Sequence, residues 1–290
     1  MTEVTIGNRK IGNDTPCYIV AEIGINHNGD LSLARKLIAA AKEAGVDAVK
    51  FQKRTVETVY TKAELDMPRE SPFGNTNRAL KEGLEFNQAE YEQIDAYCKS
   101  LYMPWFASCW DEASVDFIEQ FNPPCYKIAS ASLTDRQLLT HIKNTRKPII
   151  LGCGMTEAHE LATAVDILGT ENLIILHACS AYPAAIEDIH LNTIHTLHNL
   201  YPNAVVGYSG HETDIVVSCA AVAIGARVVE RHLTLDRQLW GSDQKASIDP
   251  HQLSQLVTNI RIVETAMGQS DIKCLESEKP VRQKLRRKYF

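Results

Sequence analysis

The chain has 290 residues, of which 44% are hydrophobic and 23% charged, and its formal net charge is −6. This composition is that of a globular protein with a sizeable core, and the acidic balance argues against a general nucleic-acid-binding protein. The N-terminus lacks a signal-peptide core and no apolar stretch is long enough to span a bilayer, which argues against membrane insertion. The eight cysteines are scattered without C-x-x-C spacing, as expected of a reduced, cytoplasmic protein.

Strand-like and helix-like segments alternate along the chain. Short apolar β-type runs predict strands at Cys17–Gly24, Ala48–Gln52, Trp105–Cys109, Cys125–Ser130, Pro148–Cys153, Leu173–Cys179, Ala204–Ser209 and Val228–Thr234. Helical periodicity follows each of them, at Leu31–Ala44, Gln88–Ser100, Glu112–Gln120, Asp135–Asn144, Glu157–Leu168, Leu191–Leu200, Asp214–Ile224 and His251–Met267. Eight strands, each followed by a helix, predict an α/β fold of the closed (β/α)8 TIM-barrel type. A doubly wound open sheet is the alternative, but residues 22–29 do not match its G-x-G-x-x-G phosphate loop.

Three segments lie outside this alternation. Residues 1–16 predict an N-terminal hairpin that plugs the bottom of the barrel, and residues 17–270 form the catalytic barrel domain. Residues 54–87 form a long insertion after the second strand, with Asn75 near its centre, and such an insertion is typical of a lid or substrate loop. Residues 271–290 form a basic, linker-like tail without the apolar residues for a core of its own.

The polar residues at the strand ends are the candidate site residues, because active sites of TIM barrels lie at the C-terminal ends of the strands. In chain order they are Glu22, Lys50, Gln52, Ser108, Lys127, Ser130, Tyr182, Ser209, His211, His232 and, in the loop after the last strand, Asp243.

Two of these residues are lysines inside β-type runs. Lys50 and Lys127 follow apolar residues, so we expect them to point into the barrel mouth. A buried ammonium needs an anion or a lowered pKa. With Ser130 and Ser209 nearby, the lysines suit a ligand that carries a phosphate and a carboxylate. The alternative is that each lysine pairs with a structural carboxylate.

Two histidines end neighbouring strands. His211 closes the string GYSGH at residues 207–211, and His232 closes the string ERH at residues 230–232. Together with Glu22 at the end of the first strand, they predict a site for a divalent metal at the open end of the barrel. The alternative is a hydrogen-bonded structural role for each imidazole.

Six strings carry a resemblance to a known family. They are AEIGINHNG at 21–29, VKFQ at 49–52, YKIAS at 126–130, GYSGH at 207–211, ERH at 230–232 and GSDQKAS at 241–247. Together they resemble the sialic acid synthase family, the N-acetylneuraminate synthase-type enzymes that condense phosphoenolpyruvate with an amino-sugar aldehyde. The resemblance runs from about residue 15 to residue 288 and implies a transferase that forms a C–C bond.

The resemblance also implies roles for the site residues. A metal ion, Mn²⁺ or Mg²⁺, would be held by His211 and His232 and would polarise the aldehyde oxygen. The enol carbon of phosphoenolpyruvate would attack the aldehyde carbon, water would add, and phosphate would leave by C–O cleavage. Phosphoenolpyruvate would lie against Lys50, Lys127, Ser130 and Ser209, and the sugar and reacting carbons near Glu22, Gln52, Tyr182 and Asp243.

The chain departs from the family pattern at several points. Ser132 stands where an acidic residue is usual, Gly152 where the family often has serine, and Ser180 where asparagine is common. The chain ends inside what resembles the linker to an antifreeze-like domain, so we expect the barrel alone, paired as a homodimer. Sugar recognition is then expected to be completed by the insertion around Asn75 or by a separate protein, and Ser108 is expected to bind substrate.

Two other functions stay open. A Schiff-base pyruvate aldolase would use Lys127 or Lys50 as its nucleophile. A sugar-binding barrel without catalytic turnover is the other, because a fold does not determine a function.

Overall fold

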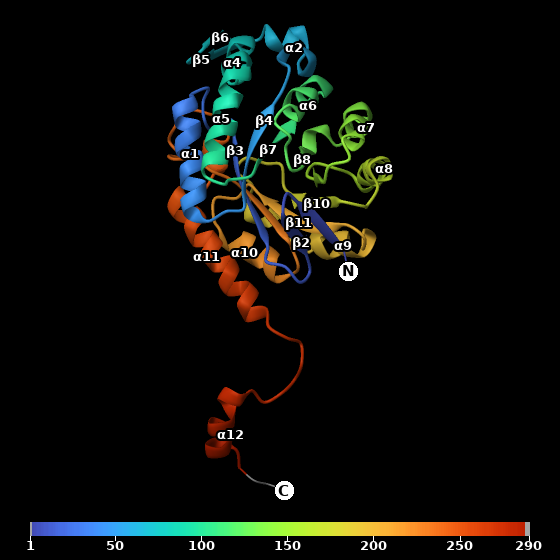
Figure 1. Cartoon of the computed structure of the whole chain (residues 1–290), viewed down its shortest axis with the longest axis vertical. Coiled ribbons are helices and arrows are strands. Elements are labelled where there is room, and N and C mark those ends of the chain that lie inside the picture. Colours follow the sequence, from blue (N-terminus) through green and yellow to red (C-terminus); the bar gives the residue numbers. More distant parts are fainter. Residues whose placement is uncertain (1, 288–290) are drawn as a thin grey trace.

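The structure, a computed structural model, describes residues 2–287. Within this range eight strands form a closed barrel in which all neighbouring strands run parallel (Figure 1). The last strand pairs with the first, Val228 opposite Tyr18, which closes the barrel and excludes the open sheet. The predicted TIM barrel is therefore confirmed. Its strands are β3 (Tyr18–Gly24), β4 (Ala48–Lys53), β7 (Trp105–Cys109), β8 (Tyr126–Ile128), β9 (Ile149–Gly152), β10 (Leu173–Ala178), β11 (Val205–Gly210) and β12 (Val228–His232).

Helices alternate with these strands and surround the barrel (Figure 1). Local sequence explains where they begin and end. The Asp30 side chain accepts hydrogen bonds from the amides of Ser32 and Leu33 at the start of the first helix, and Gly45 ends it with a left-handed φ of 81°. The barrel helices are α1 (Leu31–Ala44), α5 (Gln88–Ser100), α6 (Glu112–Glu119), α7 (Arg136–Asn144), α8 (Ala158–Leu168), α9 (Thr193–Leu200), α10 (Val216–Ala223) and α11 (Pro250–Met267).

The hydrophobic core has two parts. The larger part lies between the strands and the helices, because alternate strand residues such as Ile19, Ala21 and Val49 pack against helix residues such as Leu37. The smaller part fills the N-terminal half of the barrel interior. It is formed by Val4, Ile6, Ile11, Tyr18, Val20, Ala48, Phe106, Cys125, Ile150, Ile174, Leu176, Val205 and Val228.

An antiparallel hairpin of β1 (Glu3–Ile6) and β2 (Arg9–Gly12) supplies three residues of this inner cluster. Val4, Ile6 and Ile11 are almost fully buried against the first residues of the barrel strands. The hairpin therefore closes the N-terminal end of the barrel, which leaves the C-terminal end as the open one.

The insertion at residues 54–87 folds into three short helices and a small hairpin. Its elements are α2 (Val56–Val59), α3 (Lys62–Leu65), β5 (Pro68–Ser71), β6 (Gly74–Thr76) and α4 (Asn77–Gly83). The ring of Phe73 lies edge-on to Trp240 with centroids 6.3 Å apart, so the insertion contacts the loop after β12. A side chain at Gly83 would lie 2.2 Å from the Phe73 ring, which explains the glycine.

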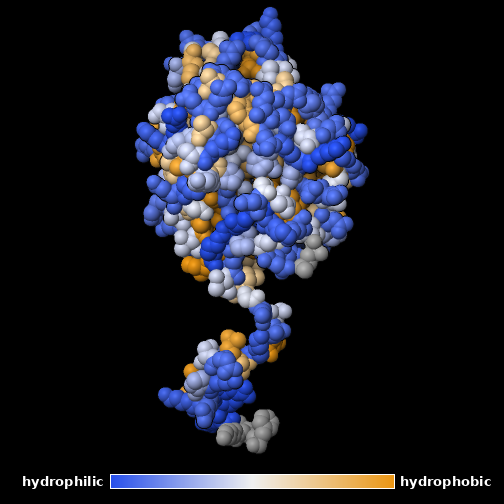
Figure 2. Space-filling model, viewed as in Figure 1, coloured by the Kyte–Doolittle hydropathy of each residue, from blue (hydrophilic) through white to orange (hydrophobic). Residues whose placement is uncertain are grey.

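The tail carries α12 (Lys279–Leu285), which stands clear of the barrel (Figure 1). Figure 2 shows hydrophobic and hydrophilic side chains on it, and Ile272, Val281 and Leu285 are exposed. Residues 288–290, the end of the predicted basic tail, lie outside the described residues. Among residues 2–287, no helix has the length and apolar character needed to cross a membrane.

Candidate active site

Polar side chains converge at the C-terminal end of the barrel around a cavity of about 280 Å³. All of the predicted site residues except Asn75 line it. They meet there because parallel strands deliver their last inward-facing residues to one end of the barrel. We call this cavity the mouth pocket. Its lining also includes Arg54, Tyr60 and Lys81 of the insertion, Trp110, and Glu230 of β12.

Two lysines and two glutamates form the floor of the mouth pocket, each at most 5% exposed. Lys50 Nζ lies 3.3 Å from both Glu22 Oε2 and Glu230 Oε1, and it donates a hydrogen bond to Ser108 Oγ at 2.9 Å. Lys127 Nζ lies 3.1 Å from Glu230 Oε1. Both lysines therefore point into the mouth pocket, as predicted. Each is also paired with a carboxylate, as the alternative of a structural ion pair predicted.

The two glutamates differ in their protonation. Burial raises the pKa of Glu22 to about 7, although the charge of Lys50 opposes it. Burial alone would also raise the pKa of Glu230, but Lys127 and Lys50 hold it well below its usual range. Burial lowers the pKa of Lys127, whereas for Lys50 the two carboxylates outweigh burial and raise the pKa. Near neutral pH, Glu230 is thus the fixed anion and Glu22 the group that can exchange a proton.

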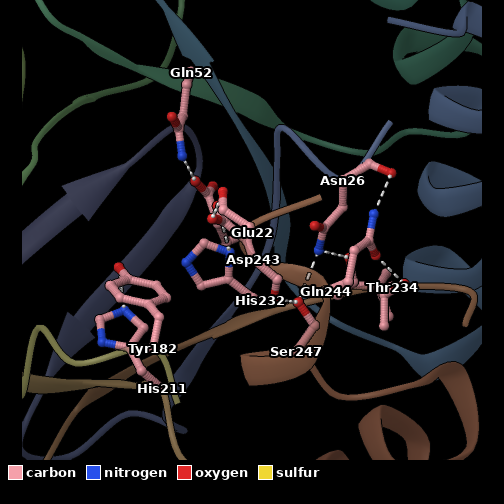
Figure 3. A network of polar contacts seen from close by, with 12 residues as sticks. Glu22, Asn26, Gln52, Tyr182, His211, His232, Thr234, Asp243, Gln244 and Ser247 are labelled. Carbon is pink, nitrogen blue, oxygen red and sulfur yellow. Dashed lines mark hydrogen bonds and ion pairs between the residues drawn. The ribbon is translucent and has the colours of Figure 1, made fainter. Parts of the chain in front are cut away.

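His211 and His232 lie side by side above this floor, with ring centroids 5.5 Å apart (Figure 3). His211 Nδ1 is 2.6 Å from the carbonyl oxygen of Cys179, and because a carbonyl only accepts, Nδ1 carries the hydrogen. His211 Nε2 then accepts a hydrogen bond from the Tyr182 hydroxyl at 2.9 Å. His232 Nδ1 is buried without a hydrogen-bond partner, and the nearest carboxylate oxygen, Asp243 Oδ2, is 3.8 Å away.

These two imidazoles have the properties of metal ligands. Burial lowers the pKa of His211 and of His232 to about 3, so both are neutral near pH 7, the form that binds a metal. His211 also has the usual support of a ligating histidine, a hydrogen bond from Nδ1 to a carbonyl, whereas Nδ1 of His232 has no such partner. No set of three or more His, Cys, Asp and Glu side chains within residues 2–287 is arranged to hold an ion. Glu22, which the prediction grouped with the two histidines, lies against Lys50 instead, so the three do not form a ligand set, and an ion held by His211 and His232 stays a prediction.

A buried polar network holds the loop that carries Asp243 (Figure 3). Asn26 Nδ2, after β3, donates to Ser247 Oγ at 2.8 Å and to the Leu233 carbonyl at 2.9 Å. Ser247 Oγ donates to the Asp243 carbonyl at 2.7 Å, and Gln244 Oε1 accepts from Thr234. Ser247, Gln244 and Thr234 are fully buried, so the network fixes the loop against the end of β12.

Three further predicted residues line the pocket through hydrogen bonds of their own. Gln52 Nε2 donates to Glu22 Oε1 at 3.1 Å, and Ser209 Oγ donates to Glu230 Oε1 at 3.1 Å. Ser130 Oγ accepts from the amide of Gly154 at 2.9 Å. A side chain at position 152 would lie 2.9 Å from that hydroxyl, which explains why glycine stands there in this chain.

The structure differs from the predicted site at two further points. Asn75 is exposed in β6 and does not line the mouth pocket, so its role in substrate binding stays a prediction. Glu230, which contacts both lysines, is absent from the predicted set. The signal was present, because Glu230 stands two residues before His232 on a strand and therefore faces the same side. Lys81 reaches the pocket because the insertion folds over it, whereas Arg54 directly follows β4, so the strand-end rule could have found it.

Comparison with known proteins agrees with the geometry. The NeuB family model matches residues 37–272. The chain is 37% identical to human N-acetylneuraminate-9-phosphate synthase over 96% of this chain and 78% of that protein. It is 35% identical to N,N'-diacetyllegionaminic acid synthase of Legionella pneumophila over 97% of this chain and 83% of that protein.

A solved structure has the same architecture over almost its whole length. It is the N-acetylneuraminic acid (sialic acid) synthetase of Leptospira borgpetersenii in complex with citrate. The TM-score is 0.87 at 32% identity, and the match covers 99% of this chain and 98% of that one. The matches bear out the resemblance that the motifs carry: the chain belongs to the NeuB family, a family of sialic-acid-synthase-type enzymes.

Proposed function

We propose that the protein condenses phosphoenolpyruvate with an amino-sugar aldehyde in a metal-dependent reaction, forming a sialic-acid-like nonulosonate and phosphate. The observation that carries the proposal is the buried set of Lys50, Lys127, Glu22 and Glu230 beneath two neutral imidazoles, inside a pocket of about 280 Å³. The names of the relatives support it, because they are synthases of N-acetylneuraminate phosphate and of legionaminic acid.

The lysines are the groups that bind phosphoenolpyruvate. The ammonium group of each lysine also lies beside the carboxylate of Glu230. The two lysines therefore neutralise the three negative charges of phosphoenolpyruvate only in part. The remaining negative charge calls for further cations at the mouth, which fits the histidine pair as a divalent-metal site. Ser130 and Ser209 add hydroxyl groups beside the same ligand.

Glu22 is the group that moves a proton. Its pKa of about 7 allows it to take a proton from the water that adds to the enol-derived carbon. Lys50, 3.3 Å away, stabilises the carboxylate form, and Gln52 fixes its orientation. The π electrons of phosphoenolpyruvate form the C–C bond, and the aldehyde oxygen, which gains the electron pair of its own π bond, takes the proton from Glu22. Phosphate then leaves with its bridging oxygen as the C–O bond breaks, and the added hydroxyl becomes the ketone carbonyl by passing its proton to phosphate.

His211 and His232 would hold the divalent ion, Mn²⁺ or Mg²⁺. When bound, the ion supplies Lewis acidity towards the aldehyde oxygen. The Tyr182 ring lies against His211 at a tilt of 32°, with ring centroids 4.1 Å apart, and Asp243 lies beside His232. Both therefore border the place where the sugar would approach.

Release of phosphate is the direct test. The purified protein is mixed with phosphoenolpyruvate and a series of amino-sugar aldoses, with and without Mn²⁺, and the phosphate and the 2-keto-3-deoxy acid are measured. We expect both products in equal amounts, and their loss on chelation. No product with any aldose contradicts the proposal.

A Schiff-base aldolase is the second candidate, and burial of Lys127 favours it because burial lowers the pKa of the amine. The ion pair of Lys127 with Glu230 opposes it by stabilising the ammonium. Borohydride in the presence of pyruvate distinguishes the two, since only the aldolase gives a covalent lysine adduct.

We also propose a cytoplasmic location and a homodimer formed through outer helices. All eight cysteines are free, which suits a reducing compartment. Val216 on α10 and Ile262 on α11 are each at least 60% exposed, and a partner subunit would bury them. The molar mass from light scattering tests the dimer.

A further inference from the structure

A buried ion pair lies behind the histidine pair, on the outer side of the barrel wall. Glu212 directly follows His211 in the chain, and Arg231 directly precedes His232. Arg231 Nη1 lies 3.0 Å from Glu212 Oε1, and neither side chain has any exposed surface. Because successive residues of a strand point to opposite faces, Arg231 faces the helices while His232 faces the mouth pocket. We call Glu212 and Arg231 the rear ion pair.

The guanidinium of Arg231 binds the segment that leads from β11 into α10. It donates hydrogen bonds to the carbonyl oxygen of Glu212, to that of Asp214 at 2.8 Å and to Ser218 Oγ at 3.0 Å. The Glu212 carboxylate accepts hydrogen bonds from Ser218 Oγ at 3.2 Å and from the Tyr208 hydroxyl at 2.7 Å. These bonds join β11, β12 and the first turn of α10 directly behind the two imidazoles.

The rear ion pair stands where the rest of the barrel wall is packed by apolar side chains, such as Val229 two residues earlier on β12. Removing two charges from water is costly, and apolar side chains would fill the same space without that cost. A Cβ at Gly210 would lie 2.7 Å from Glu212 Oε2, so only glycine leaves room for the carboxylate. The gain is direction, because hydrogen bonds fix the relative position of two groups whereas apolar burial is not directional.

Backbone pairing alone does not set the position of one histidine relative to the other. The register of β11 and β12 ends with Gly210 opposite Arg231, one residue before each histidine. His232 is paired on its other side with Glu22 of β3, whereas His211 lies beyond the last residue of β11. The hydrogen bonds of Arg231 to the segment after β11 continue the connection between the two strands past this point.

We propose that Arg231 and Glu212 are positioning residues that set the spacing and orientation of His211 and His232, and through them the affinity of the pair for a divalent ion. This inference rests on the proposed metal site. Neither residue lines the mouth pocket, so each acts through the histidine beside it. The ligands of a metal site have to be held to within about 0.5 Å of their working geometry, which calls for directional support of this kind.

The first test removes the rear ion pair as a whole. In Glu212→Gln/Arg231→Met neither charge is left buried without its partner, so the chain is expected to fold. Calorimetric titration with Mn²⁺ is expected to give an affinity about tenfold or more below that of the parent, the effect typical of residues that orient metal ligands. An affinity of the folded double variant within about twofold of the parent overturns the inference.

Two milder variants form a matched pair. Tyr208→Phe and Tyr126→Phe each remove a buried hydroxyl that donates to a glutamate at 2.7 Å behind a barrel strand, but only Tyr208 binds the rear ion pair. We expect similar falls in melting temperature. Tyr208→Phe should weaken Mn²⁺ binding by about threefold and Tyr126→Phe by less than about twofold. Equal Mn²⁺ affinities of the two variants would show a purely structural role and overturn the inference.

Spectroscopy of the imidazoles separates this inference from the proposed metal site. If the parent does not bind Mn²⁺, the metal site fails, and the rings are then compared without an ion. The Nδ1 proton of His211 is held by the Cys179 carbonyl at 2.6 Å, and nitrogen-15 NMR of labelled histidine follows its exchange with water. The proton should exchange at least about tenfold faster in Glu212→Gln/Arg231→Met, because the ring is no longer held in its orientation.

His177 is the internal control in the same spectra. Its Nε2 lies 2.5 Å from the Ile189 carbonyl, a bond of the same kind that does not involve the rear ion pair. We expect its exchange rate to change by less than about twofold. An unchanged rate for His211, or an equal increase for His177, overturns the inference whether or not the parent binds Mn²⁺.

Discussion

The two ends of the barrel interior differ completely in chemistry although the same strands build both. At the N-terminal end, Val20, Val228 and Phe106 pack with the hairpin residues Ile6 and Ile11. At the C-terminal end the interior is charged, with the buried lysines and glutamates in contact. Stability is thus concentrated at one end and chemistry at the other, as in other TIM barrels.

Single strands show the change within a few residues. Along β12, the inward-facing positions are Val228, Glu230 and His232, so the interior passes from apolar to anionic to imidazole. Along β4, Ala48 is followed two residues later by Lys50. Burying the charged layer costs free energy. The inner apolar cluster and the hairpin stabilise the same strands at the other end and offset that cost, which a barrel open at both ends could not do.

The largest expected effect is at the charged end. Replacing His211 and His232 together by alanine should weaken Mn²⁺ binding by about 100-fold or more, because both ligating nitrogens are removed. Calorimetric titration with Mn²⁺ measures this. His141→Ala, on the exposed surface of α7, is the control and should bind the ion like the parent. Tight Mn²⁺ binding by the double variant would contradict the assignment.

Lys127→Met should weaken the binding of phosphoenolpyruvate by about 100-fold, because it removes a buried positive charge from the floor of the mouth pocket. It should also lower the free energy of unfolding by about 3 kcal/mol, since Glu230 loses its partner at 3.1 Å. Calorimetry and urea unfolding give the two values.

The double variant Lys127→Met/Glu230→Gln sharpens this experiment. It removes both charges of the pair, so much of the lost stability should return while binding stays weak. Unchanged phosphoenolpyruvate affinity in the single variant would falsify the role of Lys127 as a ligand-binding cation.

The closed end should behave in the opposite way. Ile11→Ala removes a fully buried side chain from the inner cluster and should lower the free energy of unfolding by about 2–4 kcal/mol. At a temperature where the variant is folded, its kcat/KM should stay within about twofold of the parent, because the charged end is untouched. A large fall in kcat/KM of the folded variant would show that the two ends are coupled.

His27 tests whether the open end also contributes to stability. It is buried, and its ring stacks on Phe86 with centroids 4.1 Å apart. Burial lowers its pKa to about 3, with the charge of Arg54 adding to the effect, below the value of about 6.5 for an exposed histidine. The unfolded chain therefore binds the proton first, and stability falls as the pH drops from about 6.5 towards 3.

Urea unfolding of the parent and of His27→Gln between pH 4 and pH 7 measures this term. The free energy of unfolding of the variant should fall less steeply on acidification than that of the parent. The difference in slope should be at most that expected for the uptake of one proton on unfolding. Comparing slopes removes the general cost of the substitution, which is the same at each pH. Parallel stability curves for the two proteins would show that His27 is protonated equally in both states.

The smallest effect is expected in the tail. Deleting residues 277–290 should change the KM of the sugar and the melting temperature little, because α12 stands clear of the mouth pocket and its apolar residues are exposed (Figure 1). Steady-state kinetics and thermal unfolding check this. A large rise in the sugar KM would show that arginines of the tail complete the sugar site.

The sequence by itself determined the barrel and most of the mouth pocket. Apolar runs and helical periodicity alternate regularly, and capping residues such as Asp30 and Gly45 mark the helix ends, so element type follows from local chemistry. Because parallel strands end at one side of a barrel, residues at strand ends such as Glu22 and His232 were predicted to meet, and they do.

Only the tertiary structure decided which charges pair and what the insertion adds. Lys127 and Glu230 are 103 positions apart, and their 3.1 Å contact depends on how far each strand is shifted along its neighbours. The insertion has no periodic pattern that relates it to the barrel, and its position follows from packing such as that of Phe73 against Trp240. This packing places Lys81 on the wall of the mouth pocket and leaves Asn75 outside it. The local sequence pattern determines which side of a strand a residue faces. Which residue it contacts across the barrel depends on the register of all the strands in the closed barrel.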